Sequence, residues 1–493
     1  MSIKKATRID DYALGGDPII KKFEPVLEAM SMAQPRITIT ALRGGSGKTL
    51  LTLGLVAAWQ EKGYEIAPFK KGPDFIDAGW LTFSAGRSCH NLDSFLMNKQ
   101  QILESFLLNS DHADLSLIEG NRGLYDGMDV EGSSSTAELA KLLKSPVLII
   151  VDVTMTTRTI AAIVKGCQAF DPDLNIAGII LNRVAGSRQE ILIRNAVEKY
   201  CGIPVVGSVP KLKHNPFPER HMGLVPFQER DHAKKAISWS KTVVTENLQL
   251  DDIWHMAHNV KDIDVLPEVH KTETKVNTFS GALRIGFIRD KSFWFYYPEN
   301  LEQLEQMGAS LVEINAISHN ELPHLDALYI GGGFPETQAQ ALADNKTFRC
   351  ALREEIEKGL PVYAECGGLM YLGESLSVDG KIYPMVGALP IIFTLQKRPQ
   401  GHGYTVLEVD QPNPYYPVGE TLKGHEFHYS KPVMTREEGV TFIFKVGRGN
   451  GIIGLRDGIC KKNLLATYTH VHAAGNPVWA ENLIRVALDH KKK

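Results

Sequence analysis

The sequence predicts an α/β protein of two successive domains, each built on a largely parallel sheet covered by helices. At 493 residues the chain exceeds the roughly 100–200 residues of an ordinary single domain. Short apolar runs alternate with helical stretches, stop at a polar segment and start again, and such alternation is typical of parallel sheets. A glycine-rich loop directly follows the first apolar run, which is where parallel sheets bind phosphates.

Shifts in composition divide the chain into four parts. Residues 1–35 form an N-terminal extension of mixed charge whose role the sequence does not show. Residues 36–260 form the first domain, and residues 283–490 form the second. Residues 261–282 are polar and poorly periodic, so we expect a linker there.

Strands are expected where short apolar runs lie between turn signals. In the first domain these runs are residues 37–42, 66–69, 115–119, 147–152, 176–182 and 205–209. In the second domain they are residues 284–289, 311–314, 327–330 and 360–364, after which the chain becomes richer in strands. Ligands of such sheets bind in the crevice at the carboxyl ends of the strands.

Charge and cysteine content narrow the kinds of partner. A net charge of -3 and a pI near 6.6 give no sign of a surface for nucleic acid or membranes, so we expect small-molecule substrates. Six cysteines without a C-x-x-C pair fit a reducing compartment and argue against structural zinc or disulfides. The N-terminus lacks an apolar signal region and no run of about 18 apolar residues occurs, so we expect a cytoplasmic protein.

The segment RGGSGKT, residues 43–49, is the strongest functional signal. Its glycines let backbone N–H groups approach a polyphosphate, its lysine brings a positive charge to the terminal phosphates, and its threonine offers a hydroxyl to Mg²⁺. The expected ATP-binding residues are Gly44, Gly45, Ser46, Gly47, Lys48 and Thr49. A helix is expected over residues 50–59. The strict motif would require glycine at Leu42, so this is a variant loop, and a glycine-rich turn without a ligand is the alternative.

Four carboxylates are expected at the same edge of the first sheet. Asp74 and Asp77, in KKGPDFID, can hold Mg²⁺ or position a substrate group near the γ-phosphate, and capping of a helix that begins near Ala78 is the alternative. Glu119 ends a strand, where a phosphate-loop enzyme needs a second Mg²⁺ ligand. Asp126, in GLYDG, returns over this edge, although an ordinary Asp-Gly turn has the same sequence.

A second centre is expected around Cys366. This cysteine lies between a buried-looking strand and glycines that open a helix, which is the geometry of a nucleophile elbow, and the helix N-terminus would favour the thiolate. The Gly367 amide and the glycine loop at residues 331–333 can stabilise an oxyanion. His470 is the expected base, and His472 is its local competitor. An inert buried thiol is the alternative.

Together these motifs resemble the cobyrinic acid a,c-diamide synthases, which join an ATP-dependent amidoligase to a class I glutamine amidotransferase. The resemblance extends over residues 36–488 and implies a first domain like dethiobiotin synthetase and a second, α/β domain of the amidotransferase type. It rests on the segments KGPD (71–74), NLDSF (91–95), GLYDG (123–127), PERH (218–221), FYYPEN (295–300), GGGFPE (331–336), ECGG (365–368) and GHEFHYS (424–430).

The resemblance also implies a reaction. Cys366 would attack the carboxamide carbon of L-glutamine and release ammonia, with His470 as base. ATP would phosphorylate a carboxylate of a corrin-like tetrapyrrole, and ammonia would displace the phosphate to leave an amide, at both the c and a acetates. The residues that match positions for Mg²⁺-ATP and substrate carboxylates are Asp74, Asp77, Glu119 and Asp126. The implied partners are therefore small molecules, and a homodimer is compatible with this assignment.

Two departures from the family pattern leave questions open. A glutamate usually lies two residues after the catalytic histidine of class I glutaminases, whereas this chain has His472, so no third catalytic member is assigned. Asn121 and Arg122 stand where small apolar residues are more usual, and Arg122 can pair with a ring carboxylate through two hydrogen bonds. The same amidation of sirohaem or a metal sirohydrochlorin is therefore an alternative, since those rings carry the same acetates.

Two further functions compete with this interpretation. A nucleotide-switch ATPase of the partitioning type is suggested by Arg43, because such proteins carry a basic residue there that reaches a neighbouring subunit's nucleotide. The Cys366 domain argues against it, since a switch has no use for a glutaminase. A ligase of the cobyric acid synthase type is the other candidate, but the segments KGPDFID and GHEFHYS look more like the a,c-diamide branch.

Overall fold

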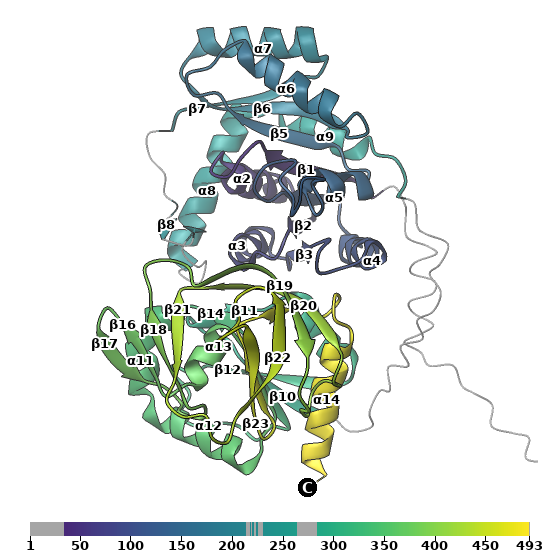
Figure 1. Ribbon diagram of the computed structural model, residues 1–493. Coiled ribbons are helices and arrows are strands. Elements are labelled where there is room, and N and C mark those ends of the chain that lie inside the picture. The colour runs from purple at the N-terminus through teal and green to yellow at the C-terminus, as the bar shows by residue number, and fades with distance from the viewer. Residues whose placement is uncertain are drawn as a thin grey trace, which may run out of the picture.

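The computed structural model describes residues 34–212, 217, 219–220, 223–224, 230–263 and 283–492. Within them the chain forms two large sheets, one of seven strands and one of ten. Figure 1 shows the bodies built on these sheets one above the other. The expected extension 1–35 and linker 261–282 lie almost entirely outside the described residues, as does part of the segment 218–221.

The first sheet is entirely parallel, with the strand order β3-β2-β4-β1-β5-β6-β7. Its strands are β1 (Arg36–Ala41), β2 (Ile66–Lys71), β3 (His90–Leu92), β4 (Leu115–Glu119), β5 (Val147–Asp152), β6 (Ile176–Val184) and β7 (Val205–Pro210). Nearly all of their side chains are buried, as expected of a parallel sheet with helices on both faces. The central strand β1 lies between β4 and β5, so the carboxyl ends of all three meet at one edge.

Eight helices of the described chain accompany the first sheet. They are α2 (Lys48–Glu61), α3 (Phe75–Ala85), α4 (Lys99–Ser110), α5 (Thr136–Leu142), α6 (Thr159–Phe170), α7 (Ser187–Cys201), α8 (Arg230–Asn247) and α9 (Leu250–His258). The helix α2 crosses α8 so closely that a Cβ at Gly54 would lie 2.5 Å from the Ser240 carbonyl oxygen. A short hairpin of β8 (Glu219–Arg220) and β9 (Gly223–Leu224) completes this body.

The second sheet is mixed. Its parallel half, in the order β12-β10-β13-β15-β24, continues into an antiparallel half in the order β23-β22-β19-β20-β25. The parallel strands are β10 (Leu283–Ile288), β12 (Ala309–Ile314), β13 (Ala327–Ile330), β15 (Val362–Glu365) and β24 (Leu464–Thr467). The antiparallel strands are β19 (Gly401–Val409), β20 (Thr421–His428), β22 (Thr441–Arg448), β23 (Arg456–Lys461) and β25 (His470–Val471).

Smaller elements surround the second sheet. The additional strands are β11 (Phe293–Phe295), β14 (Gly332–Gly333), β16 (Ser375–Val378), β17 (Lys381–Pro384), β18 (Ile391–Leu395) and β21 (Ser430–Met434). The helices are α10 (Pro298–Gln306), the 3₁₀ turn η1 (Pro335–Gln338), α11 (Ala339–Asp344), α12 (Lys346–Lys358), α13 (Gly367–Leu372) and α14 (Val478–Lys491). No helix in the described part of the chain combines the length and apolar character needed to cross a membrane.

Side chains of the two bodies contact each other directly. The Tyr404 hydroxyl donates to Asp93 Oδ2 at 2.7 Å, and His90 Nε2 lies 3.2 Å from Glu302 Oε1. Phe75, the first residue of α3, stacks on Phe295 with ring centroids 4.9 Å apart. The carboxyl edge of the first sheet therefore faces the second body.

Every strand expected from the sequence is present, with its ends within two residues of the expected positions. The strand β3 was not expected, because three residues are too few to show a hydrophobic period. The helix after the glycine loop begins at Lys48, two residues earlier than expected.

Candidate active sites

The loop between β1 and α2 has the conformation that its glycines permit. Gly47 is the N-cap of α2 with φ 94°, a left-handed conformation that favours glycine. The Asn182 side chain donates to the Ser46 carbonyl at 2.8 Å, and a Cβ at Gly47 would lie 2.5 Å from its Nδ2. Arg43 forms an ion pair with Asp152 at 2.8 Å in the same chain. Side chains of β5 and β6 thus hold the loop in place, and Gly47 has no room for a side chain.

Lys48 and Thr49 lie in one cavity with the glycines of the loop. Lys48 Nζ donates to the Arg122 carbonyl at 2.7 Å, and burial together with the nearby Lys70 charge lowers the pKa of Lys48. Both residues line a cavity of about 570 Å³ that also contains Gly44, Gly45 and Gly47. Lys70, Asp77, Asn121 and Arg122 are among the other residues that line it. We call this the nucleotide cavity.

Lys70 is a residue that the sequence interpretation missed. Its buried ammonium lies 2.6 Å from Asp77 Oδ2 and 2.6 Å from Glu119 Oε1. Burial by itself would lower the pKa of Lys70, but the carboxylates of Asp77, Glu119 and Asp74 outweigh it and raise that pKa. The position of Lys70 near the carboxyl end of β2 was a usable signal, because charged residues are rare inside parallel strands.

The oxygen atoms around Glu119 suit Mg²⁺. Thr49 Oγ1 lies 3.1 Å from Glu119 Oε1, while the buried Glu119 Oε2 has no hydrogen-bond partner among the described residues. Mg²⁺ prefers oxygen ligands and usually takes only one or two carboxylates in addition to phosphate and water. No group of three or more His, Cys, Asp or Glu side chains in the described ranges is arranged to hold a metal. Phosphate and water would have to supply the remaining ligands.

Asp74 caps a helix, as the alternative interpretation allowed. Its Oδ1 accepts hydrogen bonds from the amides of Ile76 at 2.8 Å and Asp77 at 2.9 Å, and α3 begins at Phe75 instead of near Ala78. Burial, and then the Asp77 carboxylate, raises the pKa of Asp74. While it caps α3, Asp74 also lines a second cavity, where it can contact a substrate.

The second cavity, about 460 Å³, lies between the two bodies. From the first body it is lined by Lys71, Pro73, Asp74, Phe75, Ile76, Asn121, Arg122, Asp126, Gly127, Met128 and Ser134. From the second body it is lined by Phe295, His402, Gly403, Tyr404, His425, Glu426, Phe427, Arg448 and His470. We call this the interdomain cavity. Asn121 and Arg122 also line the nucleotide cavity, so the two cavities share one wall.

Asp126 and Arg122 lie in the turn that forms this shared wall. Asp126 Oδ2 accepts the Gly123 amide at 2.8 Å, as in an ordinary turn. Arg122 has a left-handed backbone with φ 51°, which is uncommon for a residue other than glycine and often occurs at ligand sites. The side chains of both residues line the interdomain cavity.

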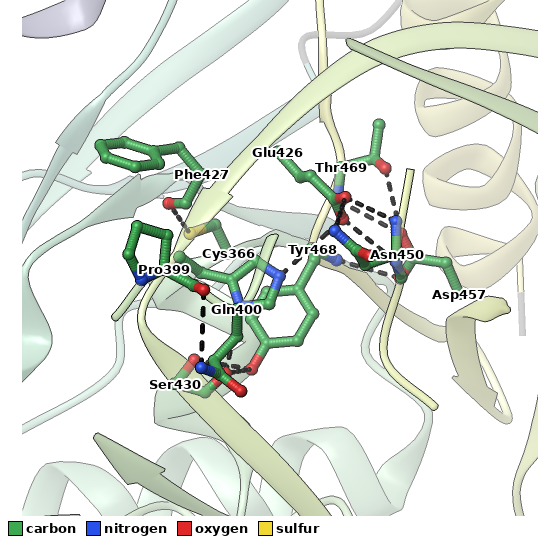
Figure 2. A network of polar contacts seen from close by, with 12 residues as sticks. Cys366, Pro399, Gln400, Glu426, Phe427, Ser430, Asn450, Asp457, Tyr468 and Thr469 are labelled. Atoms are coloured by element: carbon green, nitrogen blue, oxygen red, sulfur yellow. Dashed lines mark hydrogen bonds and ion pairs between the residues drawn. The ribbon is translucent and has the colours of Figure 1, made fainter. Parts of the chain in front are cut away.

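Cys366 forms the sharp turn of a nucleophile elbow. Its φ of 47° and ψ of -98° place it directly between β15 and α13, and its amide donates to the Thr467 carbonyl at 2.8 Å. A Cβ at Gly367 would lie 3.0 Å from the Gly333 amide nitrogen, so the elbow packs directly on the glycine loop. In Figure 2 the Cys366 side chain points to the backbone of Phe427, whose carbonyl oxygen lies 3.8 Å from Sγ.

The environment of Cys366 favours the neutral thiol. Burial, followed by the Glu336 carboxylate, raises the pKa of Cys366 well above its usual value, although the Gly367 amide opposes this. The amide at the N-terminus of α13 thus acts in the expected direction, towards the thiolate, but burial outweighs it. A neighbouring base must take the thiol proton.

His470 and His472 lie in different surroundings. A Cβ at Gly332 would lie 3.1 Å from His470 Nε2, so this nitrogen faces the glycine loop beside the elbow. His470 Nδ1 lies 3.3 Å from Glu365 Oε2, and the His470 ring packs on Phe75 with centroids 5.1 Å apart. His472 Nε2 instead lies 3.6 Å from Glu299 Oε1, and His472 does not line the interdomain cavity. His470 thus lies against the glycine loop on which the elbow packs, and this position makes it the candidate partner of Cys366.

Comparisons with known proteins agree with this division of the chain. Residues 284–478 match the family of the CobB/CobQ-like glutamine amidotransferase domain. Residues 37–225 match the CobQ/CobB/MinD/ParA nucleotide binding domain. The chain is therefore a glutamine amidotransferase joined to a nucleotide-binding domain.

Relatives that match along nearly the whole chain define the family more closely. A cobyrinate a,c-diamide synthase of Magnetococcus marinus is 42% identical over 92% of this chain and 97% of its own. The proteins of that name from Archaeoglobus fulgidus and Listeria innocua are 40% and 39% identical, over 94% and 90% of this chain and 100% and 97% of their own. The chain belongs to the cobyrinate a,c-diamide synthase family.

Proposed function

We propose that this protein is a cytoplasmic enzyme that uses ATP and glutamine to amidate the a and c acetates of cobyrinic acid. One observation carries the proposal: a single cavity is lined by His470 of the amidotransferase domain and by Asp74, Arg122 and Asp126 of the nucleotide-binding domain. Its wall is shared with the cavity that contains the phosphate loop. Ammonia released on one side would therefore reach a carboxylate activated on the other.

In the amidotransferase half, Cys366 would be the nucleophile. His470 takes the proton of the thiol, and the sulfur attacks the carboxamide carbon of glutamine, while the Gly367 amide and the glycine loop stabilise the oxyanion. His470 then returns the proton to the leaving nitrogen, so ammonia departs and a glutamyl thioester remains. Water hydrolyses the thioester to glutamate and restores the thiol. The raised pKa of Cys366 supports this route, because the thiol has to be deprotonated by a base.

In the nucleotide-binding half, the phosphate loop would hold ATP against a substrate carboxylate. The carboxylate oxygen attacks the γ-phosphorus and releases ADP, and ammonia then attacks the acyl phosphate carbon and expels inorganic phosphate. Lys48 and Lys70 balance the phosphate charges. Thr49 and Glu119 would hold Mg²⁺, which neutralises phosphate charge when bound. Asp74 and Asp126 would orient the substrate and accept a proton from the incoming nitrogen.

Joining the halves solves two chemical problems. A carboxylate is a poor electrophile until it is phosphorylated, and ammonia in water is mostly protonated near neutral pH. A cavity walled by protein shelters both the acyl phosphate and the free base from water. Burial, followed by the adjacent rings of His470 and His472, lowers the pKa of His425 well below its usual value. A neutral His425 in the cavity wall supports this role, because an uncharged imidazole is too weak an acid to protonate ammonia.

Incubation with a panel of rings tests the substrate and the reaction together. Cobyrinic acid, sirohydrochlorin and sirohaem would each be incubated with ATP and amide-¹⁵N-glutamine, and the products analysed by mass spectrometry. Two successive ¹⁵N amides on cobyrinic acid are expected. Amidation of sirohaem alone would move the assignment to the alternative ring, and no product on any ring with an intact glutaminase would overturn the tetrapyrrole assignment.

A further inference from the structure

We infer that Glu365, the residue directly before the nucleophile, is the positioning carboxylate of the catalytic histidine and takes the place of the glutamate missing two residues after it. This inference rests on the proposed glutaminase function and deepens it. His472 occupies the position after His470 where the usual carboxylate would stand. Glu365 reaches the same ring from another strand, β15, across the sheet.

Glu365 is held from both sides. It is buried with 1% of its surface exposed, and its Oε2 lies 3.3 Å from His470 Nδ1. The Tyr329 hydroxyl donates to the same oxygen at 3.1 Å, while Oε1 accepts the Val471 amide at 3.1 Å. The Tyr329 hydroxyl and the Val471 amide are both donors here, which suits a carboxylate that only accepts.

A second layer of contacts fixes these partners. Asn300 Nδ2 donates to the Tyr329 hydroxyl at 3.1 Å and to the Val471 carbonyl at 2.8 Å. Asn300 Oδ1 accepts the Ala473 amide at 2.7 Å. The side chain of Asn300 therefore ties the Tyr329 hydroxyl to the strand that carries His470. This explains the polar end of the segment FYYPEN without a direct role in the reaction.

The contact with Glu365 decides which nitrogen of His470 acts as the base. Because a carboxylate accepts hydrogen bonds, Nδ1 must carry the proton, and the lone pair of Nε2 is left to face the glycine loop and the elbow. When Nε2 takes the thiol proton, the negative charge of Glu365 stabilises the imidazolium that forms. The other groups against the ring are Phe75, Phe295 and the stacked ring of His425. Of these three groups and Glu365, only Glu365 is an anion.

The variant Glu365→Gln tests the inference. Glutamine keeps the size and the acceptor for Val471, but its amide group would face Nδ1 with N–H bonds and favour the wrong tautomer of His470. We expect the glutaminase kcat to fall about 100-fold or more, by analogy with loss of the orienting carboxylate in a Ser-His-Asp triad, with little change in KM for glutamine. The rate of Cys366 alkylation by iodoacetamide, measured against pH, should have its midpoint at higher pH than in the unmodified protein.

A matched control is Glu299→Gln, which makes the same change in the buried glutamate beside His472. It should leave both the kcat and the alkylation profile unaltered. Synthesis with ammonium chloride, measured on the same samples, should persist in Glu365→Gln and shows that the variant is folded. The alkylation profile needs neither tetrapyrrole nor glutamine, so it can be measured and interpreted even if the proposed substrate is wrong.

Two results would overturn the inference. One is a Glu365→Gln protein with the alkylation profile and glutaminase kcat of the unmodified protein. If that variant does not fold, Glu365→Asp decides, because it keeps the charge but draws the carboxylate back from His470 Nδ1, and it should shift the profile in the same direction by a smaller amount. A Glu365→Asp protein with an unshifted profile and full kcat would then exclude Glu365.

Discussion

Lys70 illustrates how one side chain organises the synthetase site. Its ammonium is buried between Asp77 and Glu119, two carboxylates that would otherwise repel each other at the base of the nucleotide cavity. A charge that is removed from water is tolerated only when its partners are close and well placed. The ion pairs of Lys70 therefore hold Glu119 in reach of Thr49.

Replacing Lys70 by methionine should destabilise the protein strongly. The two carboxylates would be left without their counter-charge, and breaking such a buried pair costs about 3–5 kcal/mol. The free energy of unfolding, from urea titration, measures the loss. Lys62→Met is the matched control, because its pair with Asp251 is exposed, and such pairs contribute about 0–1 kcal/mol. Similar unfolding curves for both variants would contradict the assigned role of Lys70.

Cys366→Ala should separate the two halves of the reaction. With no sulfur nucleophile, glutamine hydrolysis should be abolished, whereas synthesis with ammonium chloride should continue at the rate of the unmodified protein. Product formation from each nitrogen source measures this directly. Loss of synthesis from both sources in a folded variant would contradict the division of labour.

At the scale of elements, the strands and the glycine loop could be predicted because their signals are local. An apolar run between turn residues marks a strand, and RGGSGKT marks the turn from β1 into α2. The three-residue β3 could not be found in this way. Glu365 escaped for another reason: its partner His470 is 105 residues away, and their contact depends on which strands become neighbours in the second sheet.

The turn from β1 into α2 gives a test of how tightly this loop is packed. Gly47→Ala would place a Cβ 2.5 Å from Asn182 Nδ2 at a φ of 94°, so the loop must shift and ATP binding should weaken by at least about tenfold, or 1.4 kcal/mol. The control is Gly63→Ala, which has φ 90° but no atom within 4 Å of its Cβ. Binding of a fluorescent ATP analogue to each variant measures the difference. Equal affinities of the two variants would show that the close contact at Gly47 has no effect on ATP binding.

At the scale of the whole molecule, the interdomain cavity has positive side chains from both bodies. Lys71 and Arg122 come from the first body and Arg448 from the second. Arg448 lies over the Phe95 ring, with Cζ 5.6 Å from the centroid. The same cavity is lined by the carboxylates of Asp74, Asp126 and Glu426, so attraction of an acidic ring depends on direct pairing of its carboxylates with these three cations. If Arg448 forms such a pair, the amidotransferase domain helps to bind a substrate that it does not chemically alter.

Arg448→Ala should therefore raise the KM for the tetrapyrrole even when ammonium chloride replaces glutamine. Loss of one such charged contact is expected to cost about 1.5–3 kcal/mol, which corresponds to roughly a ten- to hundredfold increase. Arg436→Ala is the control, because Arg436 is an exposed residue of the same domain outside the cavity. An unchanged KM for the ring, with both nitrogen sources, would place the substrate elsewhere.

Asp74 and Phe75 are neighbours in the chain, at the start of α3 in the nucleotide-binding body. The ring of Phe75 nevertheless packs on His470 of the other body. One peptide bond thus separates Asp74, which we propose to orient the substrate, from Phe75, whose ring packs on the proposed glutaminase base. If nucleotide binding shifts this first turn of α3 and changes the affinity of the other domain for glutamine, thermodynamic linkage requires glutamine to change the affinity for nucleotide by the same factor. Binding at each of the two active sites would then depend on occupancy of the other, to the same degree in both directions.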